Sequence, residues 1–327
     1  MIKKTIGLDI GSHSLKLIEL EEQKGQVKLI KCSIRPLSKE GIELDLKKLI
    51  SAAKPSHKSV NISLSGPSVV VRYIEMPPMK KEELKSAIKF EAEKYIPFKI
   101  NESIVDCAVI EKASSGPQRV LLVATKKSDA GNLIELFKKV GMDINIIDVD
   151  SFALLNAFHR LKTGIKEDST YALLNIGAKF SNMNIAANRS VHFTRDLLWG
   201  GQDITKRIED AMNISAEEAE ALKHVPGDKR EDVVNVITPV LERFSSQIRM
   251  SFDYYESQSG KGVDKLYISG GSSYLFNIVD FLQDSLGVDT LMWDPFQDII
   301  VADGARDKEV EGIPALFAVS MGLALRK

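Results

Sequence analysis

Apolar and polar residues alternate in two parts of the chain with the two-residue period of β-strands. Near the N-terminus this pattern predicts three strands, at residues 5–9, 14–20 and 26–33. In the middle of the chain it predicts three more, at residues 171–176, 182–187 and 190–194. Because the same strand-hairpin-strand pattern occurs twice, we expect two similar lobes.

The remaining apolar patterns predict helices mixed with further strands, which indicates an α/β fold. The further strands are predicted at 60–64, 69–74, 104–111, 119–125, 144–149 and 265–269. The helices are predicted at 44–53, 82–95, 132–140, 152–161, 203–212, 216–223, 274–286 and 314–325, with one long helix ending at Tyr255. In the last helix, Ala315, Ala318 and Gly322 share one face, and we expect this stripe to cross the helix at 152–161 closely.

Each predicted hairpin has a turn typical of phosphate-binding loops. Asp9 ends the first strand and Gly11 follows it, while Asn175 and Gly177 occupy the same places in the second hairpin. Glycine lets the backbone approach a ligand, and its N–H can donate to a phosphate oxygen. The candidate phosphate-binding residues are Gly11, Ser12, His13, Ser14 and Lys16 in the first turn, and Asn175, Gly177, Ala178, Lys179 and Ser181 in the second.

Two charged residues of the first hairpin are candidates for more specific roles. The Asp9 carboxylate is placed to hold Mg²⁺ through water, because Mg²⁺ favours few carboxylates together with substrate phosphates. Lys16 interrupts an otherwise apolar strand and is placed to reach a β- or γ-phosphate. The alternatives are that Asp9 stabilises a tight turn and that Lys16 is a solvated strand residue.

Later segments are candidates for binding a nucleoside. Gly270, Gly271 and Ser272 follow a predicted strand, where glycines allow a purine ring to lie against the backbone; the alternative is an ordinary strand-to-helix turn. Gly201 leads into a predicted helix. Glu220 and Lys223 lie three residues apart on one helix face and are candidates for holding ribose hydroxyls, with a surface ion pair as the alternative.

Composition excludes several classes of function. The 327 residues carry 44 Lys and Arg against 45 Asp and Glu, which argues against a dedicated nucleic-acid-binding protein. The five histidines lie at no zinc-ligand spacing, and no Walker A sequence occurs. Two cysteines fit a reducing cytoplasm. We expect no direct membrane insertion, because no apolar run approaches the roughly 18 residues of a spanning helix.

The order of these motifs resembles the actin/Hsp70/sugar-kinase superfamily, and more narrowly the PilM family of type IV pilus assembly proteins, relatives of the cell-division protein FtsA. The segments that carry the resemblance are at residues 6–12, 76–79, 91–98, 148–154, 193–196, 200–201, 253–255 and 322–326. The resemblance covers the whole chain and implies an actin-like ATPase fold with a nucleotide cleft between two lobes. Lobe 1 would span 1–168, with an inserted α+β subdomain at about 75–147 and a connecting helix at 152–161. Lobe 2 would span 169–311, with a helical subdomain at about 200–260, and the closing helix in 312–327 would return to lobe 1.

The resemblance also implies ligands and partners. The ligands would be ATP and Mg²⁺, and the protein would be a cytoplasmic scaffold that binds the N-terminal cytoplasmic tail of a PilN-like inner-membrane protein. Pilus motor ATPases and a second copy of the chain are further candidate partners. The inserted subdomain would hold the tail, with Leu84, Ile88, Tyr95, Ile96 and Phe98 as candidate contacts. For Ile96 and Phe98, core packing under the helix is the alternative.

One departure from the superfamily bears on catalysis. Hydrolysing members carry Asp in the second phosphate turn, where this chain has Asn175, and an amide supplies no negative charge for Mg²⁺. Asp148 or Asp150, near the family's water-positioning residue, could compensate in part, so these two and Asp9 are the catalytic candidates. We therefore expect ATP binding with slow or absent hydrolysis. The competing hypotheses are a sugar or small-acid kinase, an FtsA-like filament protein, for which we would expect an amphipathic helix after the closing helix, and a member that binds no nucleotide.

Overall fold

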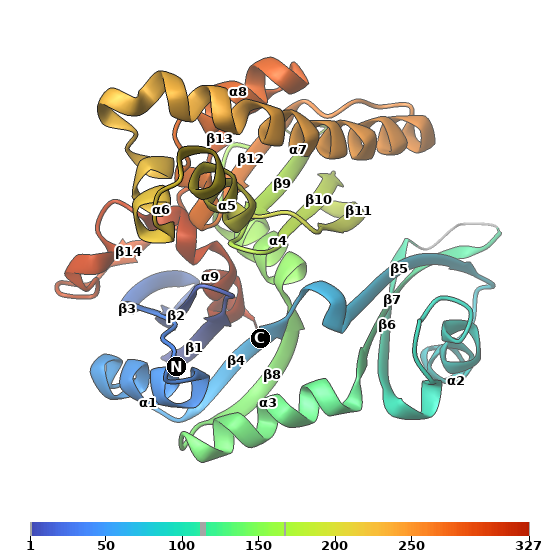
Figure 1. Cartoon of the computed structure of the whole chain (residues 1–327). Helices are drawn as coiled ribbons and strands as arrows, with labels where there is room; N and C mark the ends of the chain where they lie inside the picture. The colour runs from blue at the N-terminus through green and yellow to red at the C-terminus, as the bar shows by residue number, and fades with distance from the viewer. Residues whose placement is uncertain (1, 112–115, 167, 327) are drawn as a thin grey trace.

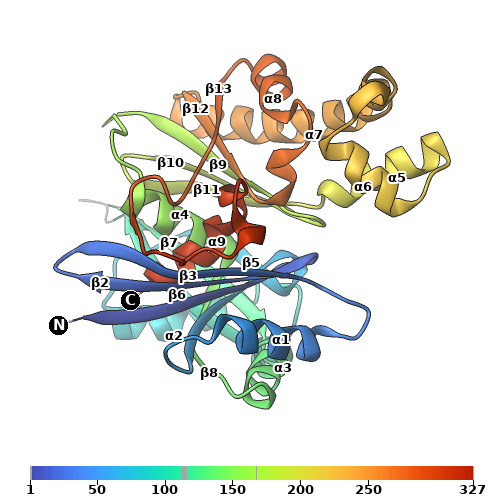
Figure 2. The same cartoon turned by 90° about the vertical axis from the view of Figure 1, so that its left-hand side faces the viewer.

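The computed structural model describes residues 2–111, 116–166 and 168–326. It has two lobes, each built on one large sheet, and a small module that projects beside them (Figure 1). Helices α4 (Asp150–Leu161) and α9 (Ala318–Leu325) lie between the two large sheets, as Figure 2 shows. The predicted α/β class with two sheet-based lobes is confirmed.

Lobe 1 contains a six-stranded sheet in the order β14-β3-β2-β1-β4-β8. Strands β1, β2 and β3 form an antiparallel meander, and β1, β4 and β8 run parallel to one another. Helices α1 (Ile42–Ala53) and α3 (Lys127–Lys139) supply residues to the same hydrophobic cluster as the sheet, including Leu46 and Phe137. The strands are β1 (Lys3–Ile10), β2 (Ser14–Gln23), β3 (Gln26–Pro36), β4 (Ser59–Leu64), β8 (Asp143–Val149) and β14 (Ile300–Val301).

Lobe 2 repeats this arrangement with a five-stranded sheet in the order β11-β10-β9-β12-β13. Its first three strands form an antiparallel meander, and β9, β12 and β13 run parallel. The sequence did not predict β13 or β14, because both are short strands at a sheet edge. The strands are β9 (Thr170–Ile176), β10 (Ser181–Ala187), β11 (Ser190–Leu197), β12 (Lys265–Ser269) and β13 (Asp289–Met292).

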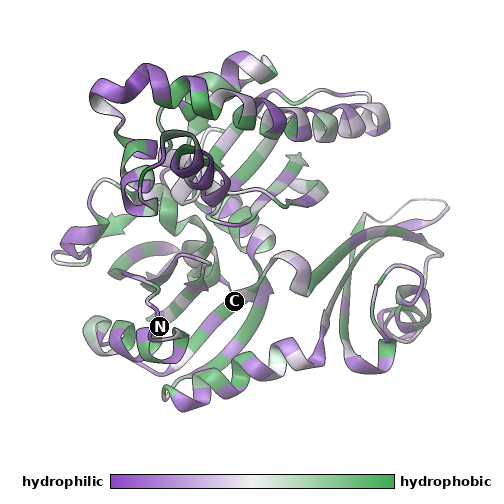
Figure 3. Ribbon diagram, viewed as in Figure 1, coloured by the Kyte–Doolittle hydropathy of each residue, from purple (hydrophilic) through white to green (hydrophobic). Residues whose placement is uncertain are grey.

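Helices α5 (Gly201–Met212), α6 (Ala216–His224), α7 (Arg230–Ser259) and α8 (Ile278–Leu286) complete lobe 2. Pro239 lies inside α7 rather than in its first turn. The strands of both lobes are mostly hydrophobic, while the outer helices alternate hydrophobic and hydrophilic residues (Figure 3). This pattern places one face of each helix on the core, as the periodicity of the sequence predicted.

The small module has boundaries that differ from those expected. Its three-stranded sheet, in the order β5-β7-β6, includes β5 (Val69–Met76), β6 (Ser103–Glu111) and β7 (Gln118–Lys126). Helix α2 (Lys81–Ala92) covers one face. The range 75–147 therefore begins inside β5 and extends too far, because α3 and β8 belong to the sheet and core of lobe 1.

Helix α9 packs so closely against α4 and β1 that only glycine fits at one contact position on each side. A Cβ atom on Gly322 would overlap the backbone carbonyl of Ala153 in α4, and one on Gly7 in β1 would overlap the carbonyl of Ser320. The predicted close crossing of the closing helix with α4 is observed at Gly322, whereas Ala315 of the predicted stripe lies before α9. The helix begins at Ala318, because Pro314–Phe317 forms a 3₁₀ turn.

We expect Gly322→Ala to lower the free energy of unfolding by about 1–3 kcal/mol, because the added methyl group must push α9 away from α4. Gly131→Ala in α3 is the matched control, since a Cβ there meets no atom within 4 Å. Alanine normally stabilises an exposed helix position by about 0.5–1 kcal/mol over glycine. Urea denaturation of both variants makes the comparison, and two variants of equal stability would contradict the packing.

Candidate functional site

A cavity of about 640 Å³ lies between the two lobes. Both hairpin turns, the start of α4, the end of α6 and the turn after β12 contribute to its wall. Most of the residues predicted from the sequence line it, namely Asp9, Gly11, Ser12, His13, Ser14, Lys16, Asp150, Asn175, Gly177, Ala178, Glu220, Lys223, Gly270, Gly271 and Ser272.

The two hairpin turns have the same backbone geometry. The Gly11 N–H donates to the Ser14 carbonyl at 3.1 Å, and the Gly177 N–H donates to the Phe180 carbonyl at 3.0 Å. A Cβ on Gly11 would lie 2.9 Å from that Ser14 oxygen, and one on Gly177 would lie 2.6 Å from the Phe180 oxygen. Each turn therefore requires glycine, and the two tips face one cavity from opposite lobes.

The first turn carries a compact group of charges. Lys16 Nζ donates to Asp9 Oδ2 at 2.8 Å, and both side chains are largely buried. Asp150, at the start of α4, accepts a hydrogen bond of 2.5 Å from Ser63. Burial and the nearby Asp9 raise the pKa of Asp150 to about 7, although hydrogen bonds from Ser63 and Ser65 act to lower it. Two carboxylates and one ammonium group thus face the cavity at this turn.

The second turn is uncharged at the corresponding positions. Asn175 and Asn182 are cross-strand partners, as Asp9 and Lys16 are in lobe 1. Asn182 Nδ2 donates to Asp196 Oδ1 on β11 at 2.6 Å. The half of the cavity formed by lobe 2 therefore presents amides where lobe 1 presents an ion pair.

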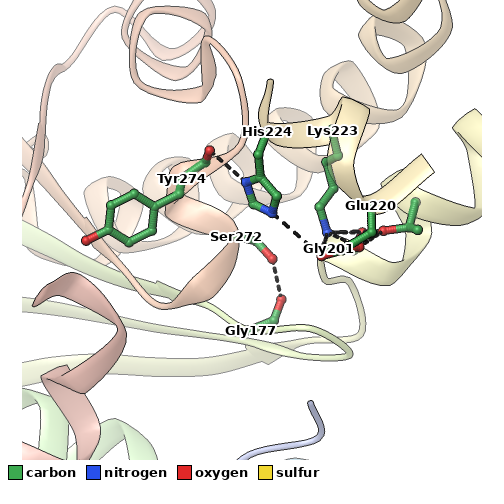
Figure 4. Close-up of polar contacts among 8 residues, drawn as sticks. Gly177, Gly201, Glu220, Lys223, His224, Ser272 and Tyr274 are labelled. Carbon is green, nitrogen blue, oxygen red and sulfur yellow. Dashed lines mark hydrogen bonds and ion pairs between the residues drawn. The ribbon is translucent and has the colours of Figure 1, made fainter. Parts of the chain in front are cut away.

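A buried network lies on the side of the cavity formed by α5 and α6 (Figure 4). Lys223 Nζ donates to both carboxylate oxygens of Glu220 at 2.7 Å and to Thr205 Oγ1 at 3.1 Å. Lys223 is only 3% exposed, which argues against a surface ion pair. His224 Nδ1 donates to the Tyr274 carbonyl at 2.9 Å and holds the end of α6 against the turn after β12.

Three glycines shape this side of the cavity. A Cβ on Gly201 would overlap Ser272 Oγ, so Gly201 supports the wall from behind without lining it. Gly270 has φ +87° and lies against the backbone of Ile176, so only glycine fits there. At Gly271 the nearest atom to a Cβ is 4.0 Å away, on Leu316, and the position faces the open cavity.

Besides Gly201, three predicted residues do not line the cavity. Asp148 forms an ion pair of 3.0 Å with Arg326 near the C-terminus. Ser181 is buried and donates to the Trp199 carbonyl at 2.8 Å, because residues along a strand alternate between its two faces. Lys179 is exposed at the tip of the turn. Asp148 and Ser181 therefore bond to groups outside the cavity. Of the two candidates Asp148 and Asp150, only Asp150 lines the cavity.

Other lining residues were missed by the sequence reasoning. They come from distant segments or have apolar side chains, which carry no chemical signal by themselves. They are Ile10, Ser65, Phe180, Asn182, Gln202, His224, Val225, Tyr274, Ile313 and Leu316. Ser65 had one available signal, since it begins the Ser-Gly-Pro turn between two predicted strands.

The expected peptide contacts lie mainly in the core of the small module. Leu84, Ile88 and Ile96 are at most 8% exposed and pack against the sheet under α2. Tyr95 is 38% exposed, and Phe98 is half-buried against the same core. The prediction of Leu84, Ile88 and Ile96 as contacts is therefore wrong, because their helical periodicity reflects packing within the module.

Neither a preformed metal cluster nor a membrane span was found in the described part of the chain. No three His, Cys, Asp or Glu side chains gather there as ligands. None of the helices in residues 2–111, 116–166 and 168–326 is long and apolar enough to cross a membrane. Asp9 and Asp150 still fit Mg²⁺, which usually takes one or two carboxylates together with phosphate oxygens and waters.

A protein-family model matches nearly the whole chain. A model of the family described as type IV pilus assembly protein PilM matches residues 7–327. The chain is 24% identical to the cell division protein FtsA of Streptococcus pneumoniae serotype 2 (strain D39 / NCTC 7466), in an alignment covering 89% of this chain and 75% of FtsA.

Solved structures show the same fold. A chain of a PilM-PilN type IV pilus biogenesis complex superposes with a TM-score of 0.88 and 27% identity, over 98% of both chains. The ethanolamine utilization protein EutJ from Carboxydothermus hydrogenoformans gives 0.54 at 16% identity, over 99% of this chain and 89% of EutJ. MreB5 of Spiroplasma citri gives 0.53 at 13% identity, over 98% and 94%. The two weaker similarities show an actin-like fold alone.

The raised pKa of Asp150 predicts a pH dependence of stability in the absence of Mg²⁺. An unfolded Asp loses its proton near pH 3.9, whereas folded Asp150 keeps it until about pH 7, so folding binds a proton between these values. The free energy of unfolding should therefore fall as pH rises through this range, relative to Asp150→Asn, which cannot titrate. Urea denaturation of both proteins from pH 4 to pH 8 measures the difference, and parallel curves would contradict it.

Proposed function

Because the chain belongs to the type IV pilus assembly protein PilM family, we propose that it is a nucleotide-binding scaffold of a type IV pilus assembly machine. In this role it binds the N-terminal cytoplasmic tail of a PilN-like inner-membrane protein. The match to the family over residues 7–327, together with the similarity to a chain of a PilM-PilN complex, carries the proposal. The protein would then lie at the cytoplasmic face of the inner membrane through this partner.

We propose Mg-ATP as the ligand of the cavity. The two glycine turns line it from opposite lobes, each closed by its own backbone hydrogen bond, and such paired turns suit a chain of phosphates. Lys16 would exchange its carboxylate partner for a phosphate, leaving Asp9 to hold Mg²⁺ through water. Glu220 and the buried Lys223 would hold the ribose, and Gly271 would lie against the purine.

The same site supports binding better than fast hydrolysis. Asn175 places a neutral amide where a hydrolysing member has a carboxylate, so the lobe 2 turn adds no charge to a metal. Asp150 is the remaining candidate for orienting water, and its raised pKa keeps part of it protonated near neutral pH. The competing sugar-kinase hypothesis finds no support in a specific observation.

We propose that the tail peptide binds the face of the small module's sheet that lies opposite α2. Most even-numbered residues of β5 and β7 pack under α2, although Arg72 is exposed, and the odd-numbered Val71, Leu121 and Val123 are half-buried on the opposite face. The register pairs Val71 directly with Val123. Tyr73 and Arg119 hold part of this face against β11, and the apolar remainder next to an edge strand suits an extended peptide, which binds by main-chain pairing and shallow pockets.

Gly271→Leu should weaken Mg-ATP binding about tenfold or more, because its side chain would fill the space where the purine lies. Gly271→Ala is the matched control and should bind normally, since its methyl group meets no atom closer than 4.0 Å. Isothermal titration calorimetry measures both affinities. If Gly271→Leu and the wild type bind Mg-ATP with equal affinity, the purine does not lie against Gly271.

Val123→Ser should weaken binding of an N-terminal PilN-like tail peptide roughly tenfold, because part of the buried apolar area is lost. Phe98→Ala is the comparison: its ring packs partly against the core, so we expect a lower melting temperature with unchanged affinity. A pull-down with such peptides, with and without Mg-ATP, followed by calorimetry, separates the surfaces. Loss of binding in Phe98→Ala alone would move the peptide to the surface pocket lined by Ile96, Pro97 and Phe98.

A further inference from the structure

Side chains on the two faces of strand β11 contact different parts of the molecule. Phe193 packs its ring on Tyr254, and Arg195 donates to Ser251, so these odd-numbered side chains contact α7. From Thr194 onward the even-numbered side chains face lobe 1, since successive strand residues point to opposite faces. His192 lies at a bulge, where its ring lies near both Tyr255 of α7 and Arg119 of β7. This edge strand of lobe 2 therefore forms a seam with the other lobe.

The seam is polar along its whole length. Thr194 forms a hydrogen bond of 2.8 Å with the Tyr73 hydroxyl on β5. Two residues earlier in β11, the backbone carbonyl of His192 accepts a hydrogen bond of 2.6 Å from Arg119 on β7. These contacts hold the small module beside β11 and leave Asp196, the last even-numbered residue, nearest to the cavity.

Asp196 connects this seam to both sides of the cavity. It accepts a hydrogen bond of 2.6 Å from Asn182, which lines the cavity, and the backbone N–H of Gly66 in lobe 1 lies near enough to lower its pKa. Burial raises the pKa of Asp196, and these two donors oppose the rise. Because a carboxylate only accepts, Asn182 must turn its NH₂ group toward Asp196 and hold its oxygen at the other end of the amide.

The lobe 1 side of this contact leads to the catalytic candidate. Gly66 has φ +61°, and a Cβ there would lie 3.3 Å from the Phe180 ring in the second phosphate turn. The adjacent Ser65 donates to Asp150. Asp196 thus lies beside the lobe 1 loop that contains Ser65 and Gly66. This loop supports Asp150 and packs against Phe180 in the second phosphate turn, which belongs to lobe 2.

We propose that Asp196 is a positioning residue of the nucleotide site, which fixes the Asn182 amide and clasps the Ser65-Gly66 loop of lobe 1 to lobe 2. The proposal rests on the proposed nucleotide-binding function and adds a residue that does not itself touch the ligand. Closure of the two turns around the phosphates depends on this clasp. Without it, bound nucleotide leaves faster, because the lobes separate more easily.

The test compares Asp196→Asn with Asp264→Asn. Both residues are in lobe 2 and accept a backbone N–H, but Asp264 bonds Thr170 at the opposite end of β9. Asp196→Asn keeps the shape and loses one acceptor, so Mg-ATP affinity should fall about tenfold, mainly through faster dissociation. Hydrogen exchange at the Gly66 amide should accelerate in the nucleotide-free protein. Asp264→Asn should change neither quantity.

The outcomes separate the two proposals. Wild-type protein that binds no Mg-ATP would end the nucleotide-binding function. Wild-type binding with unchanged affinity, dissociation rate and Gly66 exchange in Asp196→Asn would overturn the clasp alone. An equal loss of affinity in Asp264→Asn would also overturn it, because the effect would then be general destabilisation of lobe 2.

Discussion

The contact of helix α9 with β1 on one side and α4 on the other is the constraint on which the rest of the structure depends. Gly7 and Gly322 allow backbone to touch backbone at both places. Asp9 lies two residues after Gly7, and Asp150 lies one helical turn before Ala153, which Gly322 touches. The packing of one C-terminal helix therefore fixes where two carboxylates from distant segments meet in the cavity.

The two lobes share a fold but differ in charge at the cavity. Lobe 1 places an ion pair, Asp9 with Lys16, across its hairpin, and lobe 2 places the amides of Asn175 and Asn182 across the equivalent hairpin. The glycine turn with its closing hydrogen bond is kept in both hairpins, while the charge is concentrated in the first. This asymmetry is consistent with a scaffold that uses nucleotide to hold its lobes together, rather than one that turns it over quickly.

The sequence predicted the elements and turns well, because their signals are local. Alternation located the hairpins, and the requirement for glycine located both phosphate turns. Contacts made across strands or between lobes have no such signal: nothing near Asp196 in the sequence indicates Gly66. Helical spacing identified the apolar face of α2 but not what covers it, so Leu84 and Ile88 were assigned to a partner instead of the core. The small module was misplaced at its ends because a strand pattern does not show which sheet the strand joins.

Hydrogen exchange of the wild-type protein with and without Mg-ATP tests the central claim most directly. If one nucleotide is held between the two turns, the amides of residues 12–14 and 178–180 must slow together when it binds, at the same nucleotide concentration. Protection of both turns, with the same midpoint, is the result that this account predicts. Protection of only one turn, or of neither while nucleotide is bound elsewhere, would contradict it.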